Sequence, residues 1–281
     1  MFNKKKIKNY SFLSFVLAGV YFYQNKVVKK TVYKIKDRKI KKQFNNFKII
    51  HLSDIHCQKI GFSDMIFFEN IKKESPDIIV ITGDLLDSYK NNSAIAYNIL
   101  IKLREIAPCY YVSGNHELRL IDEYKELNKM FKKIGICNLS NSNVLLKKEG
   151  EEIVLSGVED LKYFYLKDNL NYYALFRNSL IENFNKDKFN ILLTHRPEKI
   201  HLYSDIGYDL VFAGHAHGGQ WNLPFLGRIF SPSQGFFPKY THGIYKEKQT
   251  RMIVSQGLGN SSFPIRINNR LEYIVVTLHT L

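Results

Sequence analysis

From residue 46 onward, short apolar or β-branched runs alternate with stretches whose apolar residues recur at helical spacing. The helical pattern covers residues 92–106, 121–134 and 169–183. The runs predicted to be strands are residues 47–52, 78–82, 110–113, 153–156, 189–194, 210–213, 252–255 and 273–278. This alternation predicts an α/β domain with a largely parallel core and some antiparallel additions.

The amino-terminal segment follows a different pattern, in which an uncharged and mostly apolar run over residues 10–23 stands between lysine-rich flanks. A helix of that length spans only about 21 Å, whereas the bilayer core is about 30 Å thick. A helix over residues 7–28 reaches the required length if Lys8 and Lys26 direct their charges to the interface. We therefore expect a single-pass membrane anchor, with a cleaved signal peptide or an amphipathic surface helix as the alternatives.

These patterns divide the chain into an anchor with basic flanks over residues 1–30, a basic linker over 31–45 and a folded domain over 46–281. Of the net charge of +15, residues 1–42 contribute +12, from 13 Lys/Arg and one Asp. The rest of the chain is nearly neutral, which argues against a nucleic-acid partner. The side of the membrane stays undecided, because the positive-inside rule and a signal-anchor favour opposite orientations.

Composition excludes two other classes of protein. With 281 residues, 45% of them hydrophobic and 14% aromatic, the chain can bury a full core and is not disordered. The three cysteines, Cys57, Cys109 and Cys137, show no CxxC spacing. A disulfide framework and a zinc ribbon are therefore both excluded.

Polar clusters follow five of the predicted strands directly. They are residues 53–56 (SDIH), 83–87 (GDLLD), 114–117 (GNHE), 195–197 (HRP) and 214–219 (GHAHGG). Ligands of open α/β sheets bind outside the carboxyl ends of the strands. We therefore expect the Asp, Asn and His side chains of all five clusters to meet on one rim.

These residue types are ligands for first-row transition metals, and a carboxylate can bridge two ions. The pairs 54/56 and 215/217 each place two ligands on the same side of an extended segment. With Asp84 as a bridge, two sites can be filled, although spacing alone does not fix the partition. One site would use Asp54, His56, Asp84 and His217, and the other Asp84, Asn115, His195 and His215.

The charge balance of such a centre suits phosphate chemistry. Two divalent ions bring four positive charges, and the two aspartates supply two negative charges. The remaining positive charge favours binding of a phosphate and lowers the pKa of a metal-bound water. The resulting metal-bound hydroxide is expected to attack phosphorus. His116 is left to protonate the leaving oxygen or to stabilise its developing charge, with Asp87 orienting the imidazole.

In this order, the motifs D-x-H, G-D-x-x-D, G-N-H-[D/E], H and G-H-x-H from Asp54 to His217 resemble the calcineurin-like metallophosphoesterases. The resemblance covers about residues 46–280 and implies a four-layer α-β-β-α sandwich, two divalent ions (Mn, Fe or Zn) and hydrolysis of phosphate esters. It also implies the partition of ligands given above and a His116–Asp87 pair. Glu117 stands where Asp is the commoner residue.

A narrower resemblance concerns residues 214–220 (GHAHGGQ), 255–259 (S-x-G-L-G) and 264–266 (PIR), together with the expected anchor. These are similar to the membrane-associated branch of the family, which includes phosphodiesterases, UDP-2,3-diacylglucosamine pyrophosphatase-type enzymes and enzymes exported to the cell wall. The resemblance implies a membrane-associated enzyme that cleaves phosphodiester or pyrophosphate bonds, with a lipid-linked or nucleotide-sugar substrate. The alternatives are a nuclease or cyclic-nucleotide phosphodiesterase, and a catalytically inactive scaffold.

The segment 221–245 is long and rich in aromatic residues and proline. Loops longer than about 12–15 residues are usually functional or disordered, and so aromatic a loop is unsuited to disorder. We expect it to cover the metal rim and to offer an apolar wall to the substrate. The candidate substrate-binding residues are Trp221, Phe236, Phe237 and His242.

Overall fold

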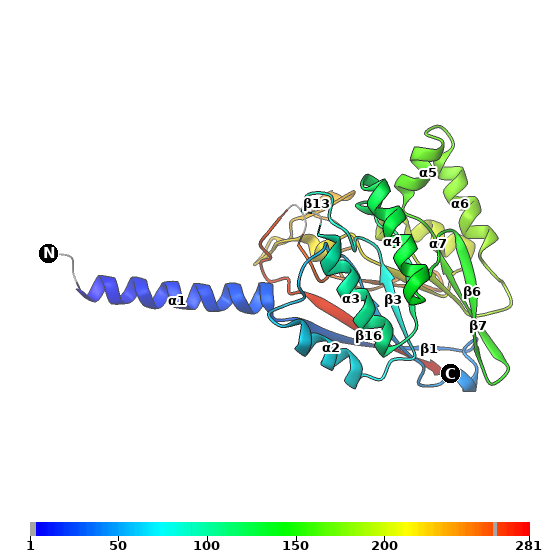
Figure 1. Ribbon diagram of the computed structural model, residues 1–281, viewed down its shortest axis with the longest axis horizontal. Coiled ribbons are helices and arrows are strands. Elements are labelled where there is room, and N and C mark those ends of the chain that lie inside the picture. Colours follow the sequence, from blue (N-terminus) through cyan, green and yellow to red (C-terminus); the bar gives the residue numbers. More distant parts are fainter. Residues whose placement is uncertain (1–3, 91, 261–262) are drawn as a thin grey trace.

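Two six-stranded sheets form the body of the protein in a computed structural model that describes residues 4–90, 92–260 and 263–281 (Figure 1). The first sheet has the order β1 (Lys29–Asp37), β16 (Glu272–Thr280), β2 (Lys48–Leu52), β3 (Ile78–Thr82), β4 (Cys109–Val112) and β5 (Cys137–Asn138). The second has the order β14 (Gly243–Glu247), β15 (Thr250–Val254), β9 (Leu210–Ala213), β8 (Asn190–Leu193), β7 (Glu151–Gly157) and β6 (Ser142–Lys148).

The strands pair as the sequence pattern predicts. Strands β2 to β5 are parallel to one another, as are β7, β8, β9 and β15. Antiparallel pairs are added where β16 meets β2, where β14 meets β15 and where β6 meets β7. The predicted α/β class is therefore confirmed, with a mostly parallel centre in each sheet.

Buried apolar side chains lie in three layers. The central layer is shared by the two sheets, with Ile49 and Val80 from the first and Ile191 and Phe212 from the second. A second layer lies under α2 (Asp64–Lys73), α3 (Ser93–Ile106) and α4 (Ile121–Ile134), and a third under α5 (Leu161–Lys167), α6 (Tyr172–Glu182) and α7 (Ile200–Ile206). The strands read as continuous apolar runs because both of their faces are covered.

Residues 31–45, expected to be a basic linker, instead contain a strand of the first sheet and the 3-10 helix η1 (Lys42–Phe44). Strand β1 runs parallel to β16 over its full length, from Lys29 opposite Glu272 to Asp37 opposite Thr280. Its apolar residues alternate with lysines, and Ile35 reaches the central core. The lysines lie on an edge strand, where they discourage pairing with other chains, so their charge concealed the alternation of a strand.

The expectation of a membrane anchor is wrong. Helix α1 (Lys4–Lys26) begins with three lysines and ends in Gln24, Asn25 and Lys26, which leaves a short apolar stretch between polar ends. Within the part of the chain that the structure describes, no helix combines the length and the apolar character needed to cross a bilayer. Residues 1–3 of the predicted anchor and the side chains of residues 4–13 lie outside the described part.

The last turn of α1 is attached to the body, while the rest of the helix extends away from it (Figure 1). Asn25 is 4% exposed, and its side chain pairs with the backbone of Arg266: Oδ1 accepts from N at 2.8 Å and Nδ2 donates to O at 3.2 Å. Gln24 Oε1 accepts from the backbone N of Asn268 at 2.8 Å. Two polar residues that lay within the predicted membrane span therefore fix the helix to the segment 266–268.

A buried carboxyl between the layers makes the fold sensitive to pH. Glu159 is 4% exposed and accepts a hydrogen bond from the Tyr124 hydroxyl at 2.9 Å. Burial raises the pKa of Glu159 from 4.5 to about 7. The pKa of Glu159 is higher in the folded state than in the unfolded state. The stability contributed by its neutral form is therefore fully present below pH 4.5 and is lost as the pH rises through 7.

We expect Glu159→Gln to remove this dependence, since the amide stays neutral at every pH. The free energy of unfolding of the native chain should fall by about 3 kcal/mol more than that of the variant between pH 4.5 and pH 8. Urea denaturation at both pH values measures the difference, with the exposed Glu105→Gln as the charge-matched control. Parallel curves for the native chain and Glu159→Gln would contradict this account.

Candidate metal centre

The polar clusters lie at equivalent strand ends. Asp54, Asp84, His195 and His215 each stand two residues beyond the last residue of β2, β3, β8 and β9, and Asn115 stands three beyond the end of β4. Because these ends face the same rim, residues separated by more than 160 positions come into contact. The backbone N of His215, for example, donates to Asp54 Oδ1 at 3.1 Å.

One group of buried side chains comprises Asp54, His56, Asp84 and His217, whose ligand atoms lie within 4.8 Å of one another. The Nε2 atoms of His56 and His217 are 3.2 Å apart. Asp84 Oδ2 lies 3.8 Å from His56 Nε2, and Asp54 Oδ1 lies 3.6 Å from His217 Nε2. Two imidazoles and two carboxylates therefore converge on one point.

A second group comprises Asp84, His195 and His215. His195 Nε2 lies 3.2 Å from Asp84 Oδ2 and 3.0 Å from His215 Nδ1. The other ring nitrogen of His195, Nδ1, is 2.8 Å from the Thr82 carbonyl, which can only accept a hydrogen bond, so Nδ1 carries a hydrogen and Nε2 faces the group. The two groups share Asp84.

Asn115, the remaining predicted ligand, lines the same cavity. Its Oδ1 atom is buried and has no hydrogen-bond partner among the described residues. A buried polar atom without a partner is costly, and an unpartnered Asn115 oxygen in this cavity indicates a missing ligand.

The donor set fits divalent transition-metal ions. Burial lowers the pKa of His56 to about 3 and that of His217 well below its ordinary value, so these imidazoles are neutral and present lone pairs. Burial also raises the pKa of Asp54 to about 6. Desolvation opposes the charged form of His195, but the neighbouring Asp84 raises the pKa of His195 to about 10. The ring therefore holds a proton at a position that a metal ion would take instead.

Five ligand candidates have a left-handed backbone conformation. Positive φ angles occur at Asp54 (52°), His56 (52°), Asp84 (50°), His215 (66°) and His217 (46°), and at eleven other non-glycine residues of the described chain. This region is uncommon for residues other than glycine, and each instance costs of order 1 kcal/mol. The fold therefore holds these five residues in strained conformations.

Glu117 ties together the two loops that carry Asp84 and Asn115. Its Oε2 accepts from the backbone N of Asp84 at 3.0 Å and of Gly114 at 2.8 Å, and its Oε1 accepts from Leu86 N at 2.8 Å. A Cβ on Gly114 would lie 2.2 Å from Asp84 Oδ1, so only glycine permits this approach. Sequence reasoning noted Glu117 as a departure from the motif and missed this role.

His116 lies beside the expected Asp87, but its hydrogen bond is made with Ser88. The backbone N of Ser88 donates to His116 Nδ1 at 3.0 Å, so a neutral imidazole carries its hydrogen on Nε2, which lies 4.0 Å from Asp84 Oδ2. Asp87 Oδ1 is 3.6 Å from His116 Nδ1, beyond hydrogen-bonding distance, and accepts instead from Tyr89 N at 2.8 Å. Asp87 Oδ2 faces His56 Nδ1 at 4.0 Å.

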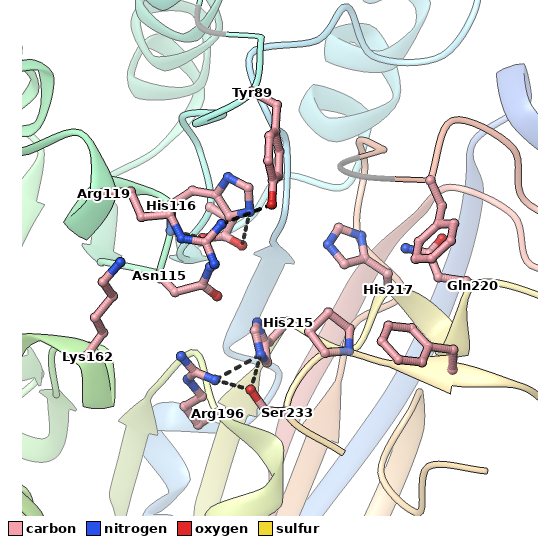
Figure 2. A pocket seen from close by; sticks show the side chains of 14 residues that line it. Tyr89, Asn115, His116, Arg119, Lys162, Arg196, His215, His217, Gln220 and Ser233 are labelled. Carbon is pink, nitrogen blue, oxygen red and sulfur yellow. Dashed lines mark hydrogen bonds and ion pairs between the residues drawn. The ribbon is translucent and has the colours of Figure 1, made fainter. Parts of the chain in front are cut away.

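A cavity of about 400 Å³ opens over both groups (Figure 2). Besides Asp84, Asn115, His116, His215 and His217, it is lined by Tyr89, Arg119, Lys162, Arg196, Gln220, Phe230, Pro232, Ser233 and Phe263. Apart from Arg196, which directly follows His195, no sequence pattern indicated the basic residues. The approach of Arg119 and Lys162 to the cavity depends on how η2 (Glu117–Arg119) and the start of α5 pack.

The four candidate substrate residues do not line this cavity. Phe236 and Phe237 are 74% and 67% exposed. His242 lines a separate cavity, and Trp221 packs on Phe263 with ring centroids 5.2 Å apart. The hairpin of β12 (Phe230–Ser231) and β13 (Gly235–Phe236) places Phe230, rather than Phe236, against the cavity.

Comparison with known proteins agrees with this geometry. The chain is 30% identical over 267 residues to the metallophosphoesterase YkuE of Bacillus subtilis, covering 90% of this chain and 86% of that protein. It is 29% identical to YkoQ of the same organism, covering 83% of each chain, and 28% identical to phosphodiesterase YaeI of Escherichia coli, covering 83% of this chain and 82% of that one. Residues 47–219 match the calcineurin-like phosphoesterases. The chain belongs to the calcineurin-like phosphoesterase family and is a metal-dependent phosphoesterase.

Proposed function

We propose that the protein hydrolyses phosphodiester or pyrophosphate bonds at a centre of two divalent metal ions. The observation that supports this most directly is the position of Asp84 Oδ2, which lies 3.8 Å from His56 Nε2 and 3.2 Å from His195 Nε2. A carboxylate shared in this way can bridge two cations. One ion would be held by Asp54, His56, Asp84 and His217, and the other by Asp84, Asn115, His195 and His215.

When bound, two such ions supply Lewis-acid activation of water and neutralise charge on the phosphate. His116 then acts on the leaving oxygen. Burial lowers the pKa of its imidazole, and Ser88 N occupies Nδ1, so the hydrogen on Nε2 is directed to the side of Asp84. From there it donates to the oxygen on which negative charge develops. Asp87 lies between His116 and His56 and helps to position both rings.

The class of bond is proposed from the cavity and from one relative. The E. coli relative is named a phosphodiesterase, and basic side chains border the cavity on one side. A lipid-linked or UDP-diacylglucosamine substrate was expected largely because of the membrane anchor, and that support is lost with the anchor. The imidazole, carboxylate and amide donors accept Mn, Fe and Zn and do not select among them.

Removal and return of metal tests the proposal. Chelation of the purified chain should lower the rate on bis-p-nitrophenyl phosphate, a diester, by more than about 100-fold, and Mn, Zn or Fe should restore it. Elemental analysis of the restored protein should find about two ions per chain. The monoester p-nitrophenyl phosphate, assayed in parallel, should be the slower substrate. A chain that takes up two ions but cleaves no ester would instead be an inactive scaffold.

A further inference from the structure

Three basic side chains border one side of the cavity over the metal centre (Figure 2). One of them, Arg196, is already paired within the protein. Its Nε and Nη2 donate to the two carboxylate oxygens of Asp160 at 2.5 and 2.9 Å, and Nη1 lies 3.0 Å from His215 Nε2. Arg196 therefore supports the ligand loop, and its charge is largely compensated.

The other two, Arg119 and Lys162, have no ion pair with a carboxylate among the described residues. Arg119 Nη1 donates to Ser88 Oγ at 3.5 Å and to Tyr89 OH at 3.4 Å, and the guanidinium carbon lies 6.0 Å from the centroid of the Tyr89 ring. Burial and then the charge of Arg119 lower the pKa of Lys162, against an opposing effect of Asp160. Two cations that line one cavity repel each other, which an anion between them would relieve.

Apolar side chains line the same cavity. They include Phe230 and Phe263, whose ring centroids are 5.8 Å apart, and Pro232. A phosphate bound at the metal centre would therefore share the cavity with cations and with aromatic rings. This combination favours a substrate with one anionic and one apolar arm.

We propose that Arg119 and Lys162 form a subsite for a second phosphate, carried on one arm of the substrate, while the other arm packs on Phe230 and Phe263. The inference rests on the proposed function and adds a substrate class to it: phosphate esters that carry a further phosphate group. Arginine suits this role because its planar guanidinium donates two parallel hydrogen bonds to phosphate, and lysine adds a compact charge.

A matched pair of substrates isolates the second phosphate. Thymidine 5′-(p-nitrophenyl phosphate) is compared with the same ester carrying a 3′-phosphate, so that the bond cleaved and the leaving group are identical. The native protein should favour the phosphorylated ester in kcat/KM. Arg119→Gln and Lys162→Gln should each reduce this preference by about tenfold, and Arg119→Lys should recover most of it. Lys167→Gln, at the exposed end of α5, the helix that also carries Lys162, should leave the preference unchanged.

Calorimetry gives a second readout that does not require turnover. Thymidine 3′,5′-bisphosphate should bind the metal-loaded protein more tightly than thymidine 5′-phosphate, and either Gln variant should reduce that advantage. An equal loss for both nucleotides, or no loss, would overturn the subsite. If neither ester is cleaved, the proposed hydrolase fails, whereas the binding comparison still decides whether the cation pair recognises phosphate.

Discussion

Asp84→Asn is expected to lower phosphodiester hydrolysis by more than about 10³-fold and to prevent stable retention of both metal ions. Asp84 supplies one of only two carboxylates among the seven ligand candidates, and its Oδ2 atom is the one shared by both groups. Replacing the carboxylate by an amide removes a negative charge. If the amide oxygen takes the place of Oδ1, the NH2 group takes the shared place of Oδ2. An NH2 group cannot bridge two cations.

The same geometry predicts that the variant folds. Asp84 Oδ1 accepts from the backbone N of His116 at 2.9 Å, and the amide oxygen of Asn can keep this bond. Metal content after dialysis, measured by elemental analysis, and circular dichroism separate loss of metal from loss of fold. Asp122→Asn, whose side chain is 90% exposed on α4, provides the matched control. An Asp84→Asn protein that kept two ions and its rate would refute the bridging assignment.

His116→Ala should lower turnover by about 10²- to 10³-fold while metal content stays near two ions per chain. His116 lines the cavity, but its Nε2 atom lies 4.0 Å from Asp84 Oδ2 and belongs to neither of the two ligand groups built on Asp84. Its contribution is a hydrogen bond to the leaving oxygen. The loss should therefore be larger for an alkyl ester than for a p-nitrophenyl ester, whose leaving group needs little help.

One alternative for His116 gives a different result. His56, Asp87 and His116 also lie close enough together to hold a cation. If His116 were a ligand, its removal would lower metal content, and the rate loss would not depend on the leaving group. His201→Ala is the control, because the His201 side chain is exposed on α7 and pairs with Glu247, which is not a ligand candidate.

The differences between expectation and structure have specific physical causes. Lysines concealed strand β1, because a charged linker and an edge strand with exposed charged residues give the same sequence pattern. The membrane anchor was predicted from a hydrophobic run whose carboxyl-terminal polar residues bind the body, since Asn25 pairs with the backbone of Arg266. In both cases the partner lies more than 240 residues away along the chain and was invisible to local pattern.

The sequence alone predicted the α/β class, the family and the candidate metal ligands, because each candidate follows directly after a buried strand and parallel strands end on one rim. Tertiary structure decided which ligands share Asp84, which atom occupies His116 Nδ1, and which side chains reach the cavity. These depend on side-chain direction and on the packing of distant loops. Phe230 therefore faces the site where Phe236 was expected, and Arg119 and Lys162, distant in sequence, line the same cavity.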